Sequence, residues 1–165
     1  MNIRLDPARP ADRDTLFRLL QYSLYEESAT DQNEMNDDGL YDYPWFDLYF
    51  TEDNRHAYLI REEGTDRLLG FAMVKDRENG REGYKIAEFM VLPKVRRNGI
   101  GRQAAIACFE RFPGNWEVSP ALGSEQARRF WERTIEAYTD GRYRWQPEER
   151  VFTFSSGGVR ISKHQ

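Results

Sequence analysis

The stretch from Tyr84 to Phe109 constrains the possible fold of this chain more than any other part of the sequence. Residues 84–92 are rich in apolar and aromatic side chains and are closed by Pro93, which is typical of a strand. Beyond Gly101, apolar residues recur at helical spacing, namely Ala104, Ala105, Ile106 and Phe109. The pattern predicts a strand, a turn and a helix, in that order.

The turn between this strand and helix has the composition of an anion site. A helix begins with backbone N–H groups that lack an internal partner, and glycines at 99 and 101 let a ligand approach the backbone closely. Four cations surround the glycines: Lys94, Arg96, Arg97 and Arg102. We therefore expect the turn to bind phosphate, and more than one phosphate group.

Two other interpretations of the glycines stay open. Gly99-x-Gly101-x-x-Ala104, with Glu117 beyond it, satisfies a relaxed dinucleotide fingerprint. Against it, residues 93–97 separate the glycines from their strand, the unit lies late in the chain, and cations fill the turn. The glycines also suit an ordinary basic turn that caps a helix. A phosphate loop of the Walker A type is excluded, because no Gly-Lys-Ser/Thr follows.

The order Arg96-Arg97-Asn98-Gly99-Ile100-Gly101, placed at the exit of a strand, resembles the acetyl-CoA signature of the GNAT N-acetyltransferases. The resemblance is specific over roughly residues 84–110 and weaker elsewhere. It implies that the backbone of this turn holds the CoA pyrophosphate. The residues it implies for acetyl-CoA are Met90, Val91, Leu92, Arg96, Arg97, Asn98, Gly99, Ile100, Gly101 and Arg102.

With 165 residues, the chain has the length of one domain, and we expect residues 1–165 to form it. No run of about 18 apolar residues occurs, and the N-terminus lacks the apolar segment of a signal peptide. We therefore expect a cytoplasmic protein without a membrane partner. The net charge of −4 argues against a nucleic-acid partner.

Several kinds of active site are excluded by residue counts. The single Cys108 allows neither an internal disulfide nor a zinc site built on cysteines, and we expect it in the core. Only His56 and His164 are available, so neither a histidine-rich metal site nor a Ser-His-Asp set is expected. No metal is predicted.

The remaining pattern predicts an α+β fold with a mixed, mostly antiparallel sheet of six to seven strands, flanked by about four helices. The expected helices lie at 10–25, 45–50, after Gly101 to about Phe112, and from Ser124 onward. Ser124 is the expected cap of the last helix, whose spacing places Ala127, Phe130, Trp131 and Ile135 on its inner side. The expected strands lie at 3–5, 57–60, 68–74, 84–91, 115–118, 143–145 and 149–154. Residues 155–165 are expected to form a mobile or partly ordered tail. The order of elements also resembles the GNAT fold.

The resemblance further implies that the 84–92 strand pairs only partly with the 116–118 strand, which leaves a gap for the pantetheine arm. Unpaired backbone N–H groups near Met90 to Leu92 would then face the oxygen that gains negative charge during acyl transfer.

Attack on a thioester requires a neutral amine, whereas an alkyl ammonium has a pKa of about 10.4. Glu88 lies on the same strand, and alternation gives it the side-chain direction of Ile86 and Met90. We expect Glu88 to be the general base. The alternative is an ion pair between Glu88 and one of the many arginines.

Many GNAT enzymes carry a tyrosine on the helix after the second parallel strand, which protonates the leaving thiolate. This chain has Ala127-Arg128-Arg129-Phe130-Trp131 there, and an indole N–H is no usable acid. Tyr138 is a distant substitute. Trp131 thus favours a second hypothesis, a non-catalytic acyl-CoA sensor on the same fold.

The acceptor side is predicted by charge. Residues 19–54, called here the acidic segment, contain ten acids and no Lys, Arg or His, with aromatic residues interleaved. Acids and aromatic faces both attract ammonium groups. We expect a cationic small molecule or peptide amine as acceptor, bound by Asp37, Asp38, Asp42 and Tyr25. A solvated acidic loop is the alternative, and the choice between monomer and homodimer stays open.

Overall fold

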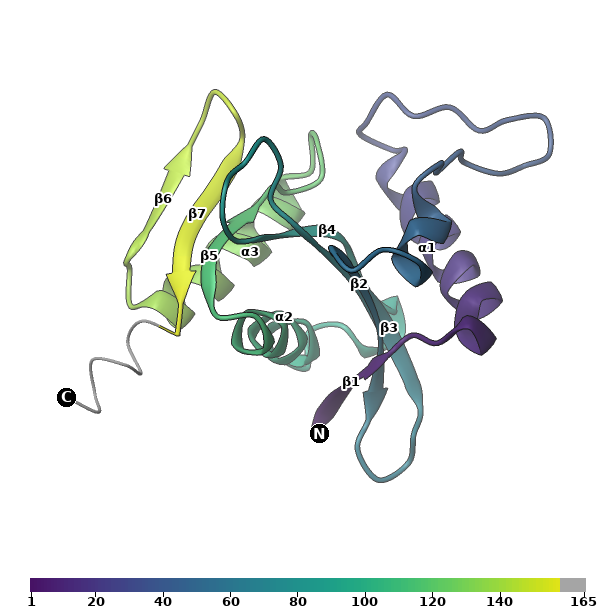
Figure 1. Ribbon diagram of the computed structural model, residues 1–165, viewed down its shortest axis with the longest axis horizontal. Helices are drawn as coiled ribbons and strands as arrows, with labels where there is room; N and C mark the ends of the chain where they lie inside the picture. The colour runs from purple at the N-terminus through teal and green to yellow at the C-terminus, as the bar shows by residue number, and fades with distance from the viewer. Residues whose placement is uncertain (158–165) are drawn as a thin grey trace.

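The computed structural model describes residues 1–157, which form a single seven-stranded sheet in the order β1-β2-β3-β4-β5-β7-β6 (Figure 1). Every neighbouring pair is antiparallel except β4 and β5, which are parallel. The strands are β1 (Ile3–Pro7), β2 (Arg55–Glu62), β3 (Leu68–Asp76), β4 (Tyr84–Val91), β5 (Gly114–Val118), β6 (Tyr143–Gln146) and β7 (Val151–Ser156). The predicted mixed sheet of an α+β fold is confirmed.

Three α-helices and three short 3-10 helices occur in the part of the chain that the structure describes. They are η1 (Pro10–Asp12), α1 (Arg13–Glu27), η2 (Phe46–Phe50), η3 (Pro93–Val95), α2 (Ile100–Arg111) and α3 (Glu125–Thr139). The four helices predicted around the sheet correspond to α1, η2, α2 and α3. The Ser124 side chain accepts a hydrogen bond from the Ala127 N–H at 3.1 Å, so the predicted helix cap is present.

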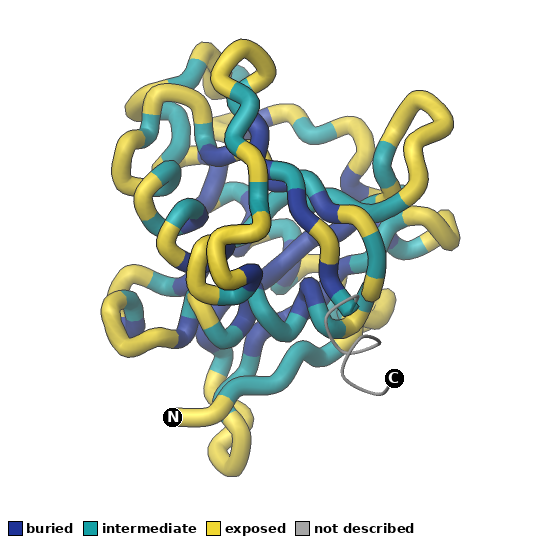
Figure 2. Tube along the Cα trace, turned by 90° about the vertical axis from the view of Figure 1, so that its left-hand side faces the viewer, coloured by how far each residue is buried: buried dark blue, intermediate teal, exposed yellow. Residues whose placement is uncertain are grey.

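Both faces of the sheet are covered, and β3 shows how. Its Phe71 and Met73 pack with α1 and η2, whereas the intervening Ala72 and the next residue, Val74, pack with α2 and α3. Residues on a strand alternate between the faces, so a strand between two helical layers must be apolar throughout. Accordingly, all residues from 69 to 74 are buried, and exposed chain lies mainly in the connections (Figure 2).

The first residues of the expected tail are ordered. Ser155 and Ser156 belong to β7, where they pair with Asn115 and Gly114 of β5. The Ser156 hydroxyl also donates to the Phe112 carbonyl at 3.2 Å, which explains why this polar residue is buried. The rest of the expected tail, residues 158–165, lies outside the described residues.

Among the described residues, no helix has the length and apolar character needed to cross a membrane. No group of three or more metal-ligating side chains occurs in residues 1–157 either.

Candidate functional site

The parallel strands β4 and β5 pair over two residues only. Tyr84 lies opposite Trp116 and Lys85 opposite Glu117, and no further pair forms between these strands within residues 1–157. β5 continues its pairing with β7 instead, and the two halves of the sheet diverge (Figure 1). From Ile86 onward, the edge of β4 that faces β5 is therefore open to hydrogen bonding.

The open edge presents the backbone of Val91. The Leu92 N–H donates to the Leu69 carbonyl of β3 at 2.8 Å. In an antiparallel ladder, N–H groups alternate between the two sides, so Met90 also faces β3 while Phe89 and Val91 face the open edge. Free N–H groups were expected from Met90 to Leu92. The Met90 and Leu92 N–H groups face β3, so the Val91 N–H is the one of the three that faces the open edge. The Val91 carbonyl accepts a hydrogen bond from Arg96 Nε at 2.8 Å.

A bulge in β4 changes the direction of Glu88. Met73 pairs with Glu88, but the next residue, Val74, pairs with Ile86, so Ala87 is one extra residue in β4. Ile86 consequently packs with the α2 and α3 side, whereas Met90 packs with the α1 side. The expectation that Glu88 shares the direction of both neighbours is wrong for Ile86 and correct for Met90. Bulges re-aim side chains in this way, and this bulge turns the carboxylate toward α1.

The Glu88 carboxylate is half-buried among other acids and a tyrosine. The Tyr43 hydroxyl donates to Glu88 Oε2 at 3.2 Å. The pKa of Glu88 is raised to about 8, first by burial and then by the negative charges of Glu27 and Asp31, while the Tyr43 hydrogen bond opposes the rise. Burial and the nearby Asp31 and Glu26 likewise raise the pKa of Glu27 to about 7. No arginine pairs with Glu88 among the described residues, so the expected alternative of an ion pair does not occur there.

The glycine turn connects the end of β4 to α2. After η3, Arg97 adopts a left-handed conformation with a φ of 68°, and Gly99 is the N-cap of α2 with a φ of 76°. No side chain caps this end of the helix. Residues 97–99 and Arg102 are exposed, so the first N–H groups of α2 lie beside an accessible, cationic surface.

Two residues of the turn have structural contacts that the sequence did not indicate. Arg96 Nη1 and Nη2 contact the Glu26 carboxylate at 3.0 and 2.8 Å, so its guanidinium links the end of β4 to the end of α1. A Cβ at Gly101 would lie 2.9 Å from the Phe130 ring of α3. Close packing of α2 on α3 therefore requires this glycine. By contrast, a Cβ at Gly99 would meet nothing within 4 Å, so only its backbone conformation and a ligand restrict that position.

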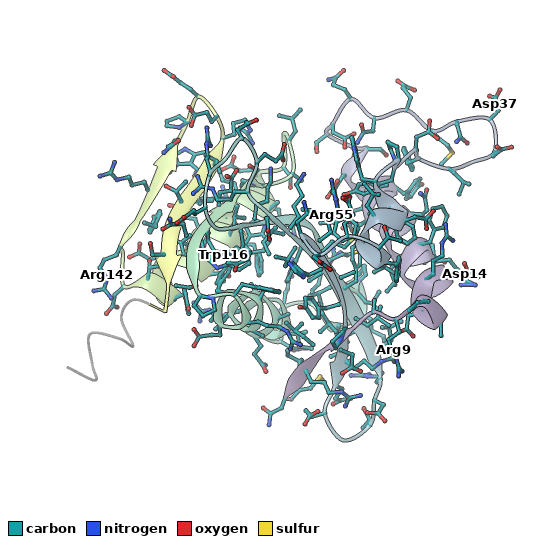
Figure 3. All side chains as sticks on the ribbon, viewed as in Figure 1. Arg9, Asp14, Asp37, Arg55, Trp116 and Arg142 are labelled. Carbon is teal, nitrogen blue, oxygen red and sulfur yellow. The ribbon has the colours of Figure 1, made fainter. Side chains whose placement is uncertain are left out.

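The predicted acceptor residues do not gather around Glu88. Asp37 lies at the outer end of the loop that follows α1 (Figure 3). Asp38 is exposed beside it, and Asp42 accepts a hydrogen bond from Asn36 Nδ2 at 3.0 Å. Tyr25 is exposed on α1. The structure instead brings Glu27 and Asp31 close enough to Glu88 to change its pKa, and these two acids were not singled out by sequence.

The aromatic residues near the open edge come from β4 and α3. Trp131 is buried, and its ring centroid lies 5.0 Å from that of Phe89. Tyr138 is no substitute acid for this region, because its hydroxyl donates to Glu110 Oε2 at 2.7 Å and its ring packs on Phe109. Helical spacing in α3 indicated that Trp131 faces inward, and the structure confirms this packing position.

Comparison with known proteins agrees with this arrangement. The family model described as "Acetyltransferase (GNAT) family" matches residues 21–136. An acetyltransferase from Thermus thermophilus is 18% identical over 93% of this chain and 94% of its own, with a TM-score of 0.61. No curated protein matches the chain significantly.

Two further solved structures share the fold. An apo nucleotide-linked sugar GNAT is 9% identical over 99% of this chain and 92% of its own, with a TM-score of 0.64. A chimera of Vibrio cholerae spermidine N-acetyltransferase and hSSAT is 11% identical over 81% of this chain and 80% of its own, with a TM-score of 0.56. These two proteins are named for different compounds, a nucleotide-linked sugar and spermidine, so likeness at this level defines the fold and leaves the acceptor undefined. Through the family match over most of its length, the chain belongs to the GNAT acetyltransferase family.

Proposed function

We propose that this protein transfers the acetyl group of acetyl-CoA to the amine of a cationic small molecule or peptide, with Glu88 as the general base. One observation carries the proposal. The half-buried Glu88 carboxylate lies on β4, on the same strand as the open edge, and its pKa is raised to about 8. Such a group is partly ionised at neutral pH and is a stronger base than an ordinary glutamate.

The residues at the open edge fit acetyl-CoA. The outward N–H of Val91 is an available donor for an acyl oxygen, and the uncapped start of α2, with Arg97 and Arg102, offers N–H groups and cations to a diphosphate. In the bound state, acetyl-CoA supplies an activated acetyl thioester. The Arg96 guanidinium already contacts the Glu26 carboxylate, and it would have to break this contact to bind phosphate.

The acids near Glu88 give the site its proposed chemistry. An alkyl ammonium with a pKa of about 10.4 arrives protonated, and the charges of Glu27 and Asp31 attract it. Glu88 then takes the proton, directly or through water, and leaves a neutral amine. Trp131 has no acidic proton to give, so protonation of the departing sulfur falls to solvent. A thiol pKa of about 8.5 makes that last step undemanding.

The function is tested by an acceptor screen that follows thiol release from acetyl-CoA. Polyamines, aminoglycoside-like compounds and lysine-bearing peptides represent the cationic acceptors, and neutral and acidic amines are the comparison. Turnover that is highest with cationic amines supports the proposal. Turnover that is highest with an anionic amine would contradict it. Binding of acetyl-CoA without turnover on any amine would favour the second candidate, an acyl-CoA sensor, which the buried Trp131 also suits.

Neutralising Glu27 should weaken binding of the amine at every salt concentration, whereas neutralising the loop acids should weaken it at low salt only. Glu27→Gln removes a half-buried charge next to Glu88, so we expect KM for the amine to rise about tenfold at low and high salt alike. The triple variant Asp37→Asn, Asp38→Asn, Asp42→Asn removes exposed charges, which act at long range. Its amine KM should rise at low salt and return to the wild-type value near ~0.5 M salt, because exposed charges are screened.

The control in this comparison is KM for acetyl-CoA, which should stay unchanged in both variants. An amine KM that is unaltered in Glu27→Gln would remove Glu27 from the acceptor site. An amine KM that is unaltered in the triple variant at low salt would return the loop to the role of a solvated surface.

A further inference from the structure

Tyr43 makes the one hydrogen bond to the Glu88 carboxylate that occurs within residues 1–157. Its hydroxyl donates to Glu88 Oε2 at 3.2 Å and joins two residues that are 45 positions apart in the chain. Burial raises the pKa of Tyr43, so this hydroxyl keeps its proton and remains a donor throughout the pH range in which Glu88 titrates.

The backbone around Tyr43 is held on both sides. Two residues earlier, Gln21 of α1 binds both backbone groups of Tyr41, accepting from its N–H at 2.8 Å and donating to its carbonyl at 2.9 Å. On the other side, the Phe46 N–H donates to the Tyr43 carbonyl at 3.1 Å. The Tyr43 ring meets the Trp45 ring edge to face at 5.6 Å. Tyr43 is therefore placed by the fold and does not depend on Glu88 for its position.

The other groups that influence Glu88 act against its ionised form. Glu27 from α1 and Asp31 from the acidic segment add negative charge. Arg55 at the start of β2 contacts other groups, because its guanidinium lies 5.5 Å from the Tyr49 ring and 3.6 Å from the Glu52 carboxylate. No ion pair joins it to Glu88 within the described chain. Within residues 1–157, Tyr43 is the one group that stabilises the ionised carboxylate.

We propose that Tyr43 is a positioning residue, which orients the Glu88 carboxylate and favours its ionised form, the form that accepts the proton of the amine. The proposal rests on the proposed function of Glu88. A hydroxyl donor forms a stronger hydrogen bond to an ionised carboxylate than to a protonated carboxyl group, because the ionised acceptor carries a negative charge. It also leaves Glu88 Oε1 without that donor, so Oε1 is the oxygen that takes up the proton.

The experiment uses Tyr43→Phe, with Tyr41→Phe as the matched control. Tyr41 lies in the same segment and is buried, and its bonds to Gln21 use its backbone, so the control removes a hydroxyl without touching Glu88. We measure the ratio of variant to wild-type kcat/KM for one amine from about pH 6 to about pH 10.5. The titration of the amine cancels in this ratio. For Tyr43→Phe, the ratio should be about 0.1 below about pH 7.5 and rise toward 1 above about pH 9.5, because loss of the donor raises the Glu88 pKa by about one unit. For Tyr41→Phe, it should stay flat near 1.

A second readout does not require turnover. The Glu88 carboxyl resonance, assigned by its absence in Glu88→Gln, is titrated by carbon-13 NMR in each protein. Its midpoint should rise by about one pH unit in Tyr43→Phe and stay in place in Tyr41→Phe. An unchanged midpoint, or an activity loss of equal size at every pH, would overturn the role of Tyr43. Full activity of Glu88→Gln would instead overturn the base assignment, and the NMR titration would still decide whether Tyr43 controls this carboxyl.

Discussion

Glu88→Gln is expected to lower acetyl transfer by a factor of ~10²–10⁴, the usual cost of losing a general base. Glutamine keeps the size of the side chain and still accepts a hydrogen bond from Tyr43, so the fold should be unaffected. The loss should appear in kcat and in kcat/KM for the amine alike, because proton removal occurs on the way to the transition state. Binding of acetyl-CoA should be unchanged.

The pH profile makes this prediction specific. The pKa of Glu88 is raised to about 8, so the carboxyl holds its proton below that pH and cannot act as a base. Wild-type activity should therefore rise and level off near about pH 8, whereas Glu88→Gln should show no inflection there and should keep rising toward the pKa of the amine. The defect should shrink as the pH approaches about 10.4, where the amine loses its proton unaided.

Glu117→Gln is the matched control for this variant. Glu117 is also a half-buried strand glutamate, but it contacts Arg77 at 2.8 Å at the closed end of the β4 and β5 pair. Its replacement should leave the pH profile in place. Equal rates of wild type and Glu88→Gln from about pH 6 to about pH 9 would show that Glu88 is not the base.

Gly99→Val is expected to raise KM for acetyl-CoA by about 100-fold, since two lost charge-assisted hydrogen bonds of about 1.5 kcal/mol each amount to roughly that factor. Gly99 has a φ of 76°, and its Cβ position is open, so the ligand-free fold has room for a side chain there. The added isopropyl group would occupy the exposed surface at the start of α2, where the diphosphate is proposed to bind.

Backbone strain must be separated from this effect, and the chain offers a close control. Gly80, in the connection between β3 and β4, has a φ of 75° and an equally open Cβ position. Valine at either site costs about 1–2 kcal/mol in this left-handed conformation, so both variants should show a similar drop in thermal stability. Only Gly99→Val should lose acetyl-CoA binding, measured by calorimetry. Wild-type affinity in Gly99→Val would show that the turn does not hold the cofactor.

Tertiary contacts were predictable where they follow from the direction of a single element. The spacing in α3 indicated that Trp131 and Ile135 face inward, and both are buried. The limited pairing of β4 with β5 was expected only through the family resemblance. Nothing in residues 84–92 by themselves distinguishes a strand that is paired on both sides from one that is not.

Contacts between distant residues account for what the sequence left out. Ala87 became an extra residue only through the register of β4 on β3, and this reversed the predicted relation of Glu88 to Ile86. The Arg96 side chain, interpreted as a phosphate ligand, meets Glu26 from 70 positions away. Similarly, Tyr43 is one of several aromatic residues of the acidic segment, and the sequence did not indicate that its hydroxyl donates a hydrogen bond to Glu88.

The sequence by itself determined the elements, their order and the glycine turn, because strand alternation, helical spacing and capping depend on residues only a few positions apart. The tertiary structure alone decided which acids lie near Glu88 and which side chains contact the residues of the glycine turn. A side chain's neighbours, its burial and hence its pKa depend on how whole elements pack, so charge composition could not identify which of the ten acids of the acidic segment lie near Glu88. Packing brought Glu27 and Asp31 to the site and left Asp37 at the outer end of its loop.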